Sequence, residues 1–427
     1  MKKVAFKTLG CRLNQYETDA IASQFQENDF QLVPFDKEAD VYVINSCTVT
    51  HQSDHKSRNF ISQANRKNPN SVLVVTGCMA TNAKNELESR KEINYVVEND
   101  RKSSVYSLVE AHFNGEIVHP SKLSDDLFSY GSTDKGFHTR SMIKIQDGCD
   151  NFCTFCIIPS VRGRAVSRPI HSILENVKSV IAKGAKEIVL TGVNIGRYEF
   201  EQYKFDDVVE QILNLDGDFR LRISSIEPDG FGDKFLSLLN HPKMTPHLHL
   251  CLQSGSDTIL LRMRRMYGIK RFKEIVNKIR FIRPDFNITT DMIIGFPGET
   301  DHDFEATCNI IRELNFGHVH AFKYSIRNGT RAERMIDQVD ERIKTKRSEL
   351  LRRIAEQVKK QYRCDFIGKV QTVLVEKTDG TNAKGYGEHY VPVEFIGSDL
   401  KKNHFYKLRI KDISTGDEPV LIGEQIK

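Results

Sequence analysis

Three cysteines with the spacing of a metal site lie near the middle of the chain, at Cys149, Cys153 and Cys156. They follow a strand-like run at 142–146, so the sequence predicts that they share one loop at the end of a strand. Three thiolates on such a loop can ligate three irons of a 4Fe–4S cluster, which normally takes four cysteines. Because no fourth cysteine lies nearby in the sequence, one iron would stay open for a small ligand.

A structural zinc site is the main alternative for these three cysteines. Zinc sites usually read as two short pairs completed by Cys or His, and no second pair lies within about twenty residues of the triplet. The sequence therefore favours an iron–sulfur cluster over zinc.

The sequence pattern of residues 1–115 predicts a separate domain, which contains a second set of three cysteines. Its short apolar runs alternate with polar segments of helical length, which is typical of a parallel α/β sheet. We expect strands at 4–9, 41–44, 72–75 and 95–97, and helices at 14–28, 54–67, 82–91 and up to about 112.

Cys11, Cys47 and Cys78 each follow directly after one of the first three predicted strands. Taken singly, each could be an ordinary buried thiol. In a parallel sheet, however, the carboxyl ends of the strands meet at one edge, where ligands gather. We therefore expect the three cysteines to form a second cluster site with one open iron.

After the triplet, strand-like and helical segments alternate again and predict a β/α barrel over 140–362. Six strand–helix units can be counted, and the loops at the carboxyl ends of the strands should carry the chemistry. Glycine-rich turns in such loops also occur for geometric reasons alone. The candidate cofactor-binding residues in these loops are Phe155, Thr191, Gly192, Ser224, Glu227, Gln253, Ile294 and Gly295.

A basic helix at 340–363 leads into a different kind of sequence. Strand candidates follow without helices at 370–376, 390–395, 405–413 and 419–422, which suggests a five-stranded barrel of the oligonucleotide-binding type. The fold class is therefore α/β, with a parallel-sheet domain (1–115), a linker (116–139), a partial or full β/α barrel (140–362) and a small all-β barrel (363–427).

Charge patterning points to a polyanionic partner. The net charge is +5, but 262–283 holds nine Lys or Arg against one Glu, and 341–363 holds nine against three. Such stretches suit RNA, although a solvated helix face is the commoner reason for any one basic run. The candidate substrate-binding residues are Arg162, Arg164, Arg168, Arg265, Lys401 and Lys402.

The cysteine usage and the apolar content indicate a cytoplasmic protein. Nine cysteines, clustered where metal binding explains them, imply a reducing compartment. No apolar run approaches the roughly 18 residues that span a bilayer, so we expect no membrane partner.

Several motifs together resemble the methylthiotransferase family of radical S-adenosylmethionine (SAM) enzymes. They are the triplet itself, Leu-Thr-Gly-Val-Asn-Ile-Gly at 190–196, Leu-Gln-Ser-Gly-Ser at 252–256, Met-Arg-Arg-Met-Tyr at 263–267 and Asp-Met-Ile-Ile-Gly-Phe-Pro-Gly-Glu-Thr at 291–300. The terminal β-module resembles the TRAM domain of this family, so the resemblance covers the whole chain.

The first cysteine motif distinguishes the branches of the family. It reads Leu-Gly-Cys-Arg-Leu-Asn at 9–14, similar to the MtaB branch, which acts on N6-threonylcarbamoyladenosine (t6A) at position 37 of tRNA, beside the anticodon. The MiaB branch, acting on isopentenyladenosine, typically shows Tyr-Gly-Cys-Gln-Met-Asn. The RimO branch, acting on an aspartate of a ribosomal protein, shows Leu-Gly-Cys-Pro-Lys-Asn.

The resemblance implies an enzyme that transfers a sulfur-containing group with two 4Fe–4S clusters and SAM. The cluster on the Cys149 triplet would donate an electron to SAM, and the resulting radical would remove hydrogen from carbon 2 of the adenine. The cluster on Cys11, Cys47 and Cys78 would carry the sulfur. Hydrogen abstraction at this carbon is cofactor chemistry, so no catalytic residue is expected beyond the cluster ligands.

The implied partners are the tRNA anticodon stem-loop and an electron donor such as flavodoxin or ferredoxin, with no DNA. The alternatives are the isopentenyladenosine and ribosomal-protein reactions. A non-catalytic iron–sulfur sensor that binds RNA is the alternative from a different class.

Overall fold

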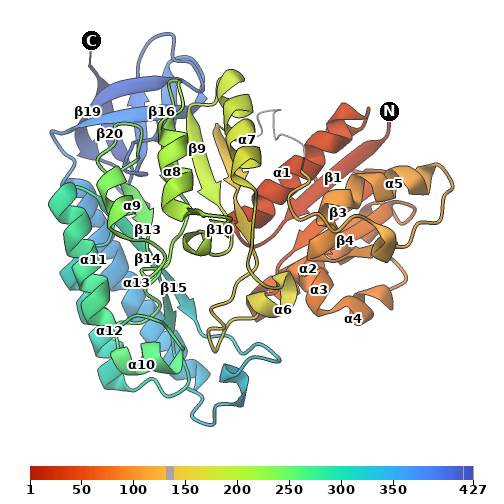
Figure 1. Ribbon diagram of the computed structural model, residues 1–427, viewed down its shortest axis with the longest axis horizontal. Helices are drawn as coiled ribbons and strands as arrows, with labels where there is room; N and C mark the ends of the chain where they lie inside the picture. Colours follow the sequence, from red (N-terminus) through yellow and green to blue (C-terminus); the bar gives the residue numbers. More distant parts are fainter. Residues whose placement is uncertain (131–138, 417, 427) are drawn as a thin grey trace.

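The computed structural model describes residues 1–130, 139–416 and 418–426. Figure 1 shows an N-terminal α/β domain, a central set of parallel strands with outer helices, and a small C-terminal β-barrel. The three-part α/β architecture expected from the sequence is confirmed.

The N-terminal domain is a five-stranded parallel sheet in the order β2-β1-β3-β4-β5. Every residue of β3 and β4 is buried, because helices cover both faces of the sheet. One face packs on α1 and α5, and the other on α2, α3 and α4. The strands are β1 (Lys3–Thr8), β2 (Gln31–Val33), β3 (Val41–Ser46), β4 (Val72–Gly77) and β5 (Tyr95–Val97), and the helices are α1 (Arg12–Glu27), α2 (His51–Lys67), α3 (Cys78–Asn82), α4 (Lys84–Glu88), η1 (Asn99–Ser104) and α5 (Val105–Phe113).

Two local expectations for this domain were wrong. The single helix expected at 82–91 is two short helices, because the backbone breaks at Ala83 and the first helix already begins at Cys78, directly after the Gly77 turn. The edge strand β2 was not expected, since three residues carry too little periodicity to be recognised.

The expected linker at 116–139 falls partly outside the described residues, at 131–138. Its described part contains η2 (Pro120–Lys122) and is tied to the N-terminal domain. The Arg101 guanidinium donates to the Leu123 carbonyl, and the Ser103 hydroxyl donates to the Asp126 carbonyl at 2.9 Å.

The central domain contains six parallel strands in chain order, which confirms the six expected units. Two three-stranded sheets, β6-β9-β12 and β13-β14-β15, are joined by isolated parallel bridges such as Ile226–Leu250. The strands are β6 (Arg140–Lys144), β9 (Glu187–Thr191), β12 (Arg220–Ile223), β13 (His247–His249), β14 (Asn287–Ile294) and β15 (His318–Lys323). The result is a partial barrel with β6 and β15 as its edge strands.

The larger outer helices of the barrel also follow the expectation, whereas several short elements do not. The main helices are α7 (Ile170–Ala182), α8 (Phe205–Leu213), α9 (Asp233–Leu238), α11 (Ile269–Ile282) and α12 (Asp301–Leu314). The short elements lie in the loops: β7 (Gln146–Asp147), α6 (Ile158–Arg162), β8 (Val166–Ser167), η3 (Ile195–Arg197), β10 (Glu199–Phe200), β11 (Tyr203–Lys204), α10 (Asp257–Arg262) and η4 (Ala332–Arg334).

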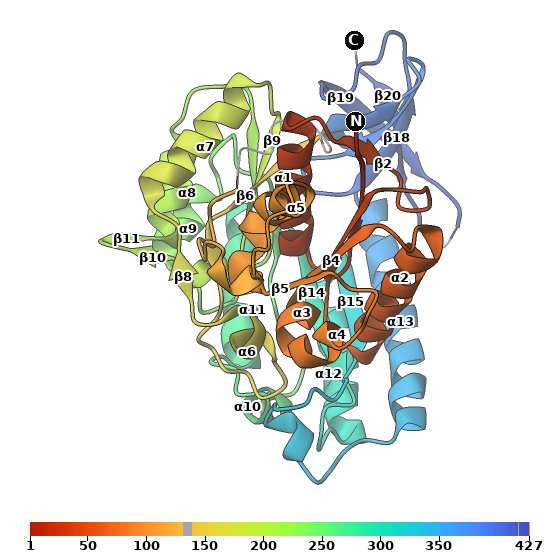
Figure 2. The same ribbon diagram turned by 90° about the vertical axis from the view of Figure 1, so that its right-hand side faces the viewer.

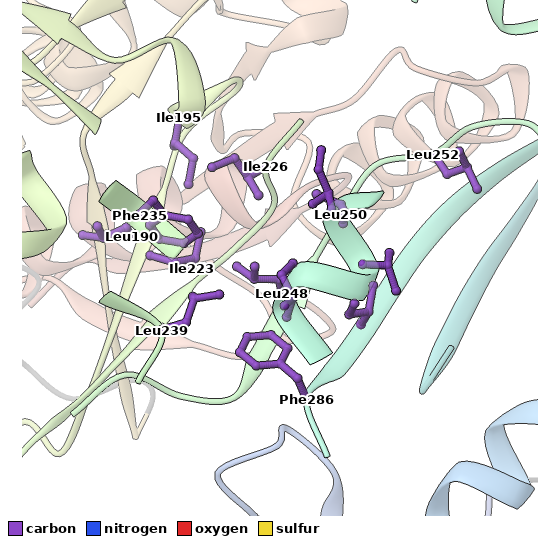
Figure 3. Close-up of a cluster of buried hydrophobic side chains, with 14 of the residues drawn as sticks. Leu190, Ile195, Ile223, Ile226, Phe235, Leu239, Leu248, Leu250, Leu252 and Phe286 are labelled. Carbon is purple, nitrogen blue, oxygen red and sulfur yellow. The ribbon is translucent and has the colours of Figure 1, made fainter. Parts of the chain in front are cut away.

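The hydrophobic core of the barrel lies between its strands and outer helices. Figure 3 shows Leu190, Ile223 and Leu248 from three successive strands packed with Phe235 of α9. Each of these side chains is fully buried and contributes about 1.5–3 kcal/mol of hydrophobic stabilisation. This core holds the strand ends, and hence the loops of the site, in place.

The C-terminal module is a closed five-stranded barrel, as expected, in the order β16-β17-β18-β20-β19. The long helix α13 (Glu341–Cys364) leads into it, and Tyr362 at the end of that helix packs into the module's core. The strands are β16 (Val370–Thr378), β17 (Asn382–Tyr386), β18 (Pro392–Ile396), β19 (Phe405–Ile413) and β20 (Leu421–Gln425). The sequence had not revealed β17, whose Asn-Ala-Lys-Gly-Tyr run has no strand-like alternation of large apolar residues.

The N-terminal domain covers the open side of the barrel, as the two views together show (Figures 1 and 2). Helix α1 lies against β6. At the other edge, the segment after β15 meets the N-terminal domain, where Arg327 pairs with Asp54 at 2.6 Å and donates to the Thr48 carbonyl at 2.9 Å. Among the described residues, no helix has the length and apolar character needed to cross a membrane.

Candidate active site

The loop that carries Cys149, Cys153 and Cys156 is held by backbone contacts at both ends. Gly148 has φ +68°, and a Cβ there would lie 1.9 Å from the Arg164 carbonyl oxygen, so this position requires glycine. Inside the loop, the Thr154 amide donates to the Met263 carbonyl at 3.1 Å, and its own carbonyl accepts from the Ala332 amide at 2.9 Å. These backbone contacts define the shape of the loop.

The Cys156 thiol lies close enough to Cys153 and Cys149 to interact electrostatically with both. Burial and the neighbouring Cys153 thiolate together raise the pKa of the Cys156 thiol to about 12. The Arg265 guanidinium donates to the Cys153 sulfur at 3.2 Å, and the Asn194 amide lies 3.8 Å from the Cys149 sulfur. A bound metal cluster would replace the thiol protons, and these two donors would then stabilise the thiolate ligands.

The structure also brings Cys11, Cys47 and Cys78 together at the carboxyl edge of the N-terminal sheet. Cys11 precedes α1, Cys47 follows β3, and Cys78 begins α3. Burial and the nearby thiolates of Cys78 and Cys11 together raise the pKa of Cys47 to about 11, so the three sulfurs are close enough to interact.

Glycine makes this second convergence possible. Gly10 has φ +93°, and a Cβ there would lie 2.8 Å from the Cys47 sulfur. Gly77 has φ +95°, and its Cβ would lie 2.4 Å from the Ser46 carbonyl oxygen. Larger residues at either position would push the cysteines apart. Two trios of convergent thiols fit two clusters that are each held by three cysteines.

Cysteines from both trios line one cavity of about 480 Å³, which we call the cluster cavity. Its lining includes Cys11 and Cys47 from the N-terminal domain, and Cys156, Phe155 and Gln253 from the barrel. Two candidate cluster sites from different domains thus border one cavity.

A second cavity of about 550 Å³ lies inside the partial barrel, between the N-terminal domain and the C-terminal module. We call it the histidine pocket, because His247 and His249 of β13 and His318 and His320 of β15 line it. The two cavities share Cys11, Asp291 and Phe322, so they adjoin one another.

The predicted SAM-binding residues divide between these cavities. Thr191, Gly192 and Ser224 line the histidine pocket, and Phe155 and Gln253 line the cluster cavity. Among the described residues, the buried Ser224 hydroxyl and the Asn194 side-chain oxygen have no hydrogen-bond partner. Buried polar atoms are rarely left unpaired, so these atoms suit a polar ligand such as SAM.

The remaining three predicted cofactor residues lie near this space but are already engaged or covered. Glu227 pairs with Arg265 beside the triplet. Ile294 is buried in the barrel core, and the Gly295 amide donates to Glu299 at 3.0 Å. Binding of SAM by any of the eight residues stays a prediction.

The predicted substrate-binding arginines occupy different environments. Arg164 is exposed and pairs with Asp150, whereas Arg168 is largely buried and donates to Ser172 and Asn176. Arg265 lies at the triplet, as described above. Lys401 and Lys402 are exposed on the C-terminal module.

Arg162 lies in a place that the sequence did not suggest. Its guanidinium is buried, and it donates to Glu17, Asp147 and Asn14. With its donors engaged inside the protein, Arg162 connects the barrel to the N-terminal domain and does not face a substrate surface.

Sequence reasoning missed the side chains of the histidine pocket. The available signals were the alternating His-Leu-His at 247–249 and His-Val-His at 318–320, which place both histidines of each strand on one face. Arg12 was noticed only as part of a cysteine motif, although its side chain also lines the pocket.

Comparison with known proteins agrees with this geometry. Residues 3–98 match the family model described as uncharacterized protein family UPF0004, and residues 143–311 match the radical SAM superfamily. A solved radical SAM methyltransferase, TsrM from Kitasatospora setae, shares the fold with a TM-score of 0.54 at 14% identity, covering 75% of each chain.

Curated relatives match over nearly the full length. Threonylcarbamoyladenosine tRNA methylthiotransferase MtaB of Bacillus subtilis is 38% identical, covering 96% of this chain and 94% of the relative. MtaB of Thermotoga maritima is 36% identical, covering 97% and 95%. A tRNA-2-methylthio-N(6)-dimethylallyladenosine synthase of Methylacidiphilum infernorum is 33% identical, covering 90% and 86%.

The fold, the two cysteine trios and these relatives define a radical SAM methylthiotransferase. Within this class, the chain belongs to the MtaB family.

Proposed function

We propose that this protein is a tRNA methylthiotransferase that adds a methylthio group to carbon 2 of t6A at position 37. The observation that carries the proposal is the cluster cavity, where cysteines of both trios face one space. The MtaB relatives at 36–38% identity support t6A as the substrate over isopentenyladenosine, whose synthases match at 30–33%.

In this proposal, Cys149, Cys153 and Cys156 hold one 4Fe–4S cluster, and Cys11, Cys47 and Cys78 hold the other. When bound, the clusters and SAM supply the electron, the hydrogen-abstracting radical and the sulfur. The protein's own residues position these groups and exclude water from them.

Several side chains have roles that follow from their contacts. Arg265 neutralises negative charge at Cys153, from which its guanidinium lies 3.2 Å away. The ring of Phe155 packs edge-on against that of Phe296, with 6.4 Å between the ring centroids. Phe155 gives the cluster cavity an apolar wall that shields a radical from solvent. Thr191, Gly192 and Ser224 bind polar groups of SAM at the strand ends.

The domains divide the work as the sequence suggested: 1–115 for the sulfur-carrying cluster, 140–362 for SAM, and 363–427 for tRNA. The basic helix α13 and the exposed Lys401 and Lys402 would contact phosphates of the anticodon stem-loop. Reduction of the clusters requires an electron donor such as flavodoxin or ferredoxin, and the site of action is the cytoplasm.

Mass spectrometry of tRNA nucleosides tests the proposal. Cells that lack the gene should lose methylthio-t6A, keep methylthio-isopentenyladenosine, and regain the former when the gene is restored. Loss of methylthio-isopentenyladenosine instead would refute the choice of substrate. A non-catalytic sensor is excluded if the reduced, cluster-loaded protein converts SAM to 5′-deoxyadenosine.

A further inference from the structure

The histidine pocket holds buried polar atoms that lack partners. Among the described residues, Nδ1 of His247 and the side-chain oxygen of Asn287 make no hydrogen bond, although these residues are only 2% and 3% exposed. Such atoms are costly unless a ligand or water satisfies them. Both residues line the pocket, which lies in the usual size range for small-ligand sites.

The carboxylates of the pocket are already paired. Glu418 pairs with Lys359 at 3.0 Å and lies 4.0 Å from Arg363. Asp291 lies 3.4 Å from the imidazole of His249.

Arg12 differs from the other charged residues of the pocket. It is exposed to the pocket space, and no carboxylate in the described part of the chain pairs with it. Its guanidinium donates to the Tyr390 hydroxyl at 3.1 Å and lies over the Tyr390 ring, 5.2 Å from the centroid. The aromatic contact holds the side chain in position and leaves most of its donors available for an anion.

Three histidines of the pocket, His247, His318 and His320, supply neutral donors and acceptors. Burial and the neighbouring His320 together lower the pKa of His318 to about 4. Burial also lowers the pKa of His247 well below its usual range, and that of His320 in the same direction. At neutral pH the formal positive charge that is available to a ligand therefore comes from Arg12.

We propose that the histidine pocket receives the N6 substituent of the substrate adenosine, and that Arg12 binds its carboxylate. This inference rests on the proposed function, because the threonylcarbamoyl group of t6A ends in a carboxylate and also carries a hydroxyl and a urea. The unpaired atoms of His247 and Asn287 can hydrogen-bond those polar groups. Arg12 directly follows the cluster ligand Cys11, so a carboxylate held there keeps the adenine beside the cluster cavity.

The same pocket is a poor site for an isopentenyl group. Burying that apolar chain would leave Arg12 without an anion, and Nδ1 of His247 and Oδ1 of Asn287 without a hydrogen-bond partner. A site built to hydrogen-bond its substrate rejects an analogue that lacks the polar groups by a large factor, on the order of 10⁴. The pocket thus accounts for a choice between the two adenosine modifications.

A double-mutant cycle, in which Arg12 of the enzyme and the carboxylate of the substrate are changed singly and together, tests the contact between them. The RNA is an anticodon stem-loop that carries t6A, or the same RNA with the threonyl carboxylate converted to the amide. Its affinity for cluster-loaded protein is measured by fluorescence anisotropy, and kcat/KM for methylthiolation by mass spectrometry. The proteins are wild type, Arg12→Gln, Arg12→Lys, and Arg312→Gln, which removes one exposed arginine on the outer helix α12 as a matched control.

For the t6A RNA, Arg12→Gln should lower kcat/KM about 10- to 100-fold, the usual worth of a charge-assisted hydrogen bond. Arg12→Lys should recover most of this loss, and Arg312→Gln should behave like wild type. Replacing the t6A RNA by the amide RNA should lower kcat/KM of wild type by a similar factor. The same replacement should not lower kcat/KM of Arg12→Gln any further. Iron is measured in every variant, and rates are expressed per assembled pair of clusters, because Arg12 adjoins Cys11.

Equal losses for wild type and Arg12→Gln on changing carboxylate to amide would overturn the proposal, since the two groups would then not interact. Failure of the proposed function is a different result: wild type would leave the t6A RNA unmodified. In that case the affinities measured by fluorescence anisotropy still test the proposed contact. An RNA affinity that depends on neither the carboxylate nor Arg12 would overturn the proposal. An RNA affinity that depends on both would sustain the pocket as a carboxylate-binding site.

Discussion

Replacing Glu17 by glutamine should destabilise the contact between the N-terminal domain and the barrel. Glu17 lies on α1 and is fully buried. Its carboxylate accepts from Lys102 at 2.5 Å, and from Lys144 and Arg162 at 3.0 Å each. Lys102 belongs to the N-terminal domain, whereas Lys144 and Arg162 belong to the barrel, so one carboxylate links both domains.

The expected size of the effect follows from burial. Glutamine keeps the shape but removes the charge that pairs with Lys102, and it leaves Lys144 and Arg162 paired with Asp147. Removing one partner of a buried ion pair typically costs about 3–5 kcal/mol. For a chain of 427 residues, that corresponds to a fall in Tm of roughly 3–6 °C.

The same carboxylate predicts a pH dependence of stability. The surrounding Arg162, Lys102 and Lys144 outweigh the effect of burial and hold the pKa of Glu17 well below its usual range. A lowered pKa means that the stabilisation is present above the ordinary carboxyl pKa of about 4.5 and is lost as the pH falls through the folded value. Glu17→Gln should therefore lose stability at pH 7 and show a smaller further loss on acidification than wild type does.

Thermal unfolding followed by circular dichroism, under anaerobic conditions, measures both effects. The control is Glu27→Gln, which removes the same charge from an exposed position on the same helix and should change Tm by less than about 1 °C. A Tm for Glu17→Gln that matches this control would refute the reasoning, because the buried network would then contribute nothing to domain docking.

Replacing Cys149, Cys153 and Cys156 together by alanine should halve the iron content and abolish 5′-deoxyadenosine formation, because SAM would lose its anchor and its electron source; residual SAM cleavage would contradict the barrel assignment. Replacing Cys11, Cys47 and Cys78 should leave the barrel folded and SAM cleavage active while methylthiolation disappears, since the sulfur would have no site; normal methylthiolation would make these cysteines ordinary thiols. Changing Lys401 and Lys402 to glutamine should weaken tRNA binding and lower the salt slope of log K by about 2 if both contact phosphates; an unchanged slope in a titration with salt would exclude those contacts.

Features that depend on short stretches of chain could be predicted from the sequence. The cysteine triplet lies within one loop, so its convergence needs no knowledge of the fold. The strands expected at 95–97 and 405–413 match the structure because alternating or uniformly apolar runs of strand length leave little other choice. Even the distant trio of Cys11, Cys47 and Cys78 was accessible, because parallel strands carry their carboxyl ends to one edge.

Contacts between residues far apart in the chain were decided by the three-dimensional arrangement of the domains. Arg162 had the sequence context of a loop arginine, and only the docking of α1 against β6 places Glu17 beside it. In the same way, Arg12 meets Tyr390 of the C-terminal module across 378 residues of chain, and His249 and His320 meet only because β13 and β15 flank β14. Local sequence propensity carries no information about such contacts. They form only when surfaces of distant segments pack against each other in the folded protein.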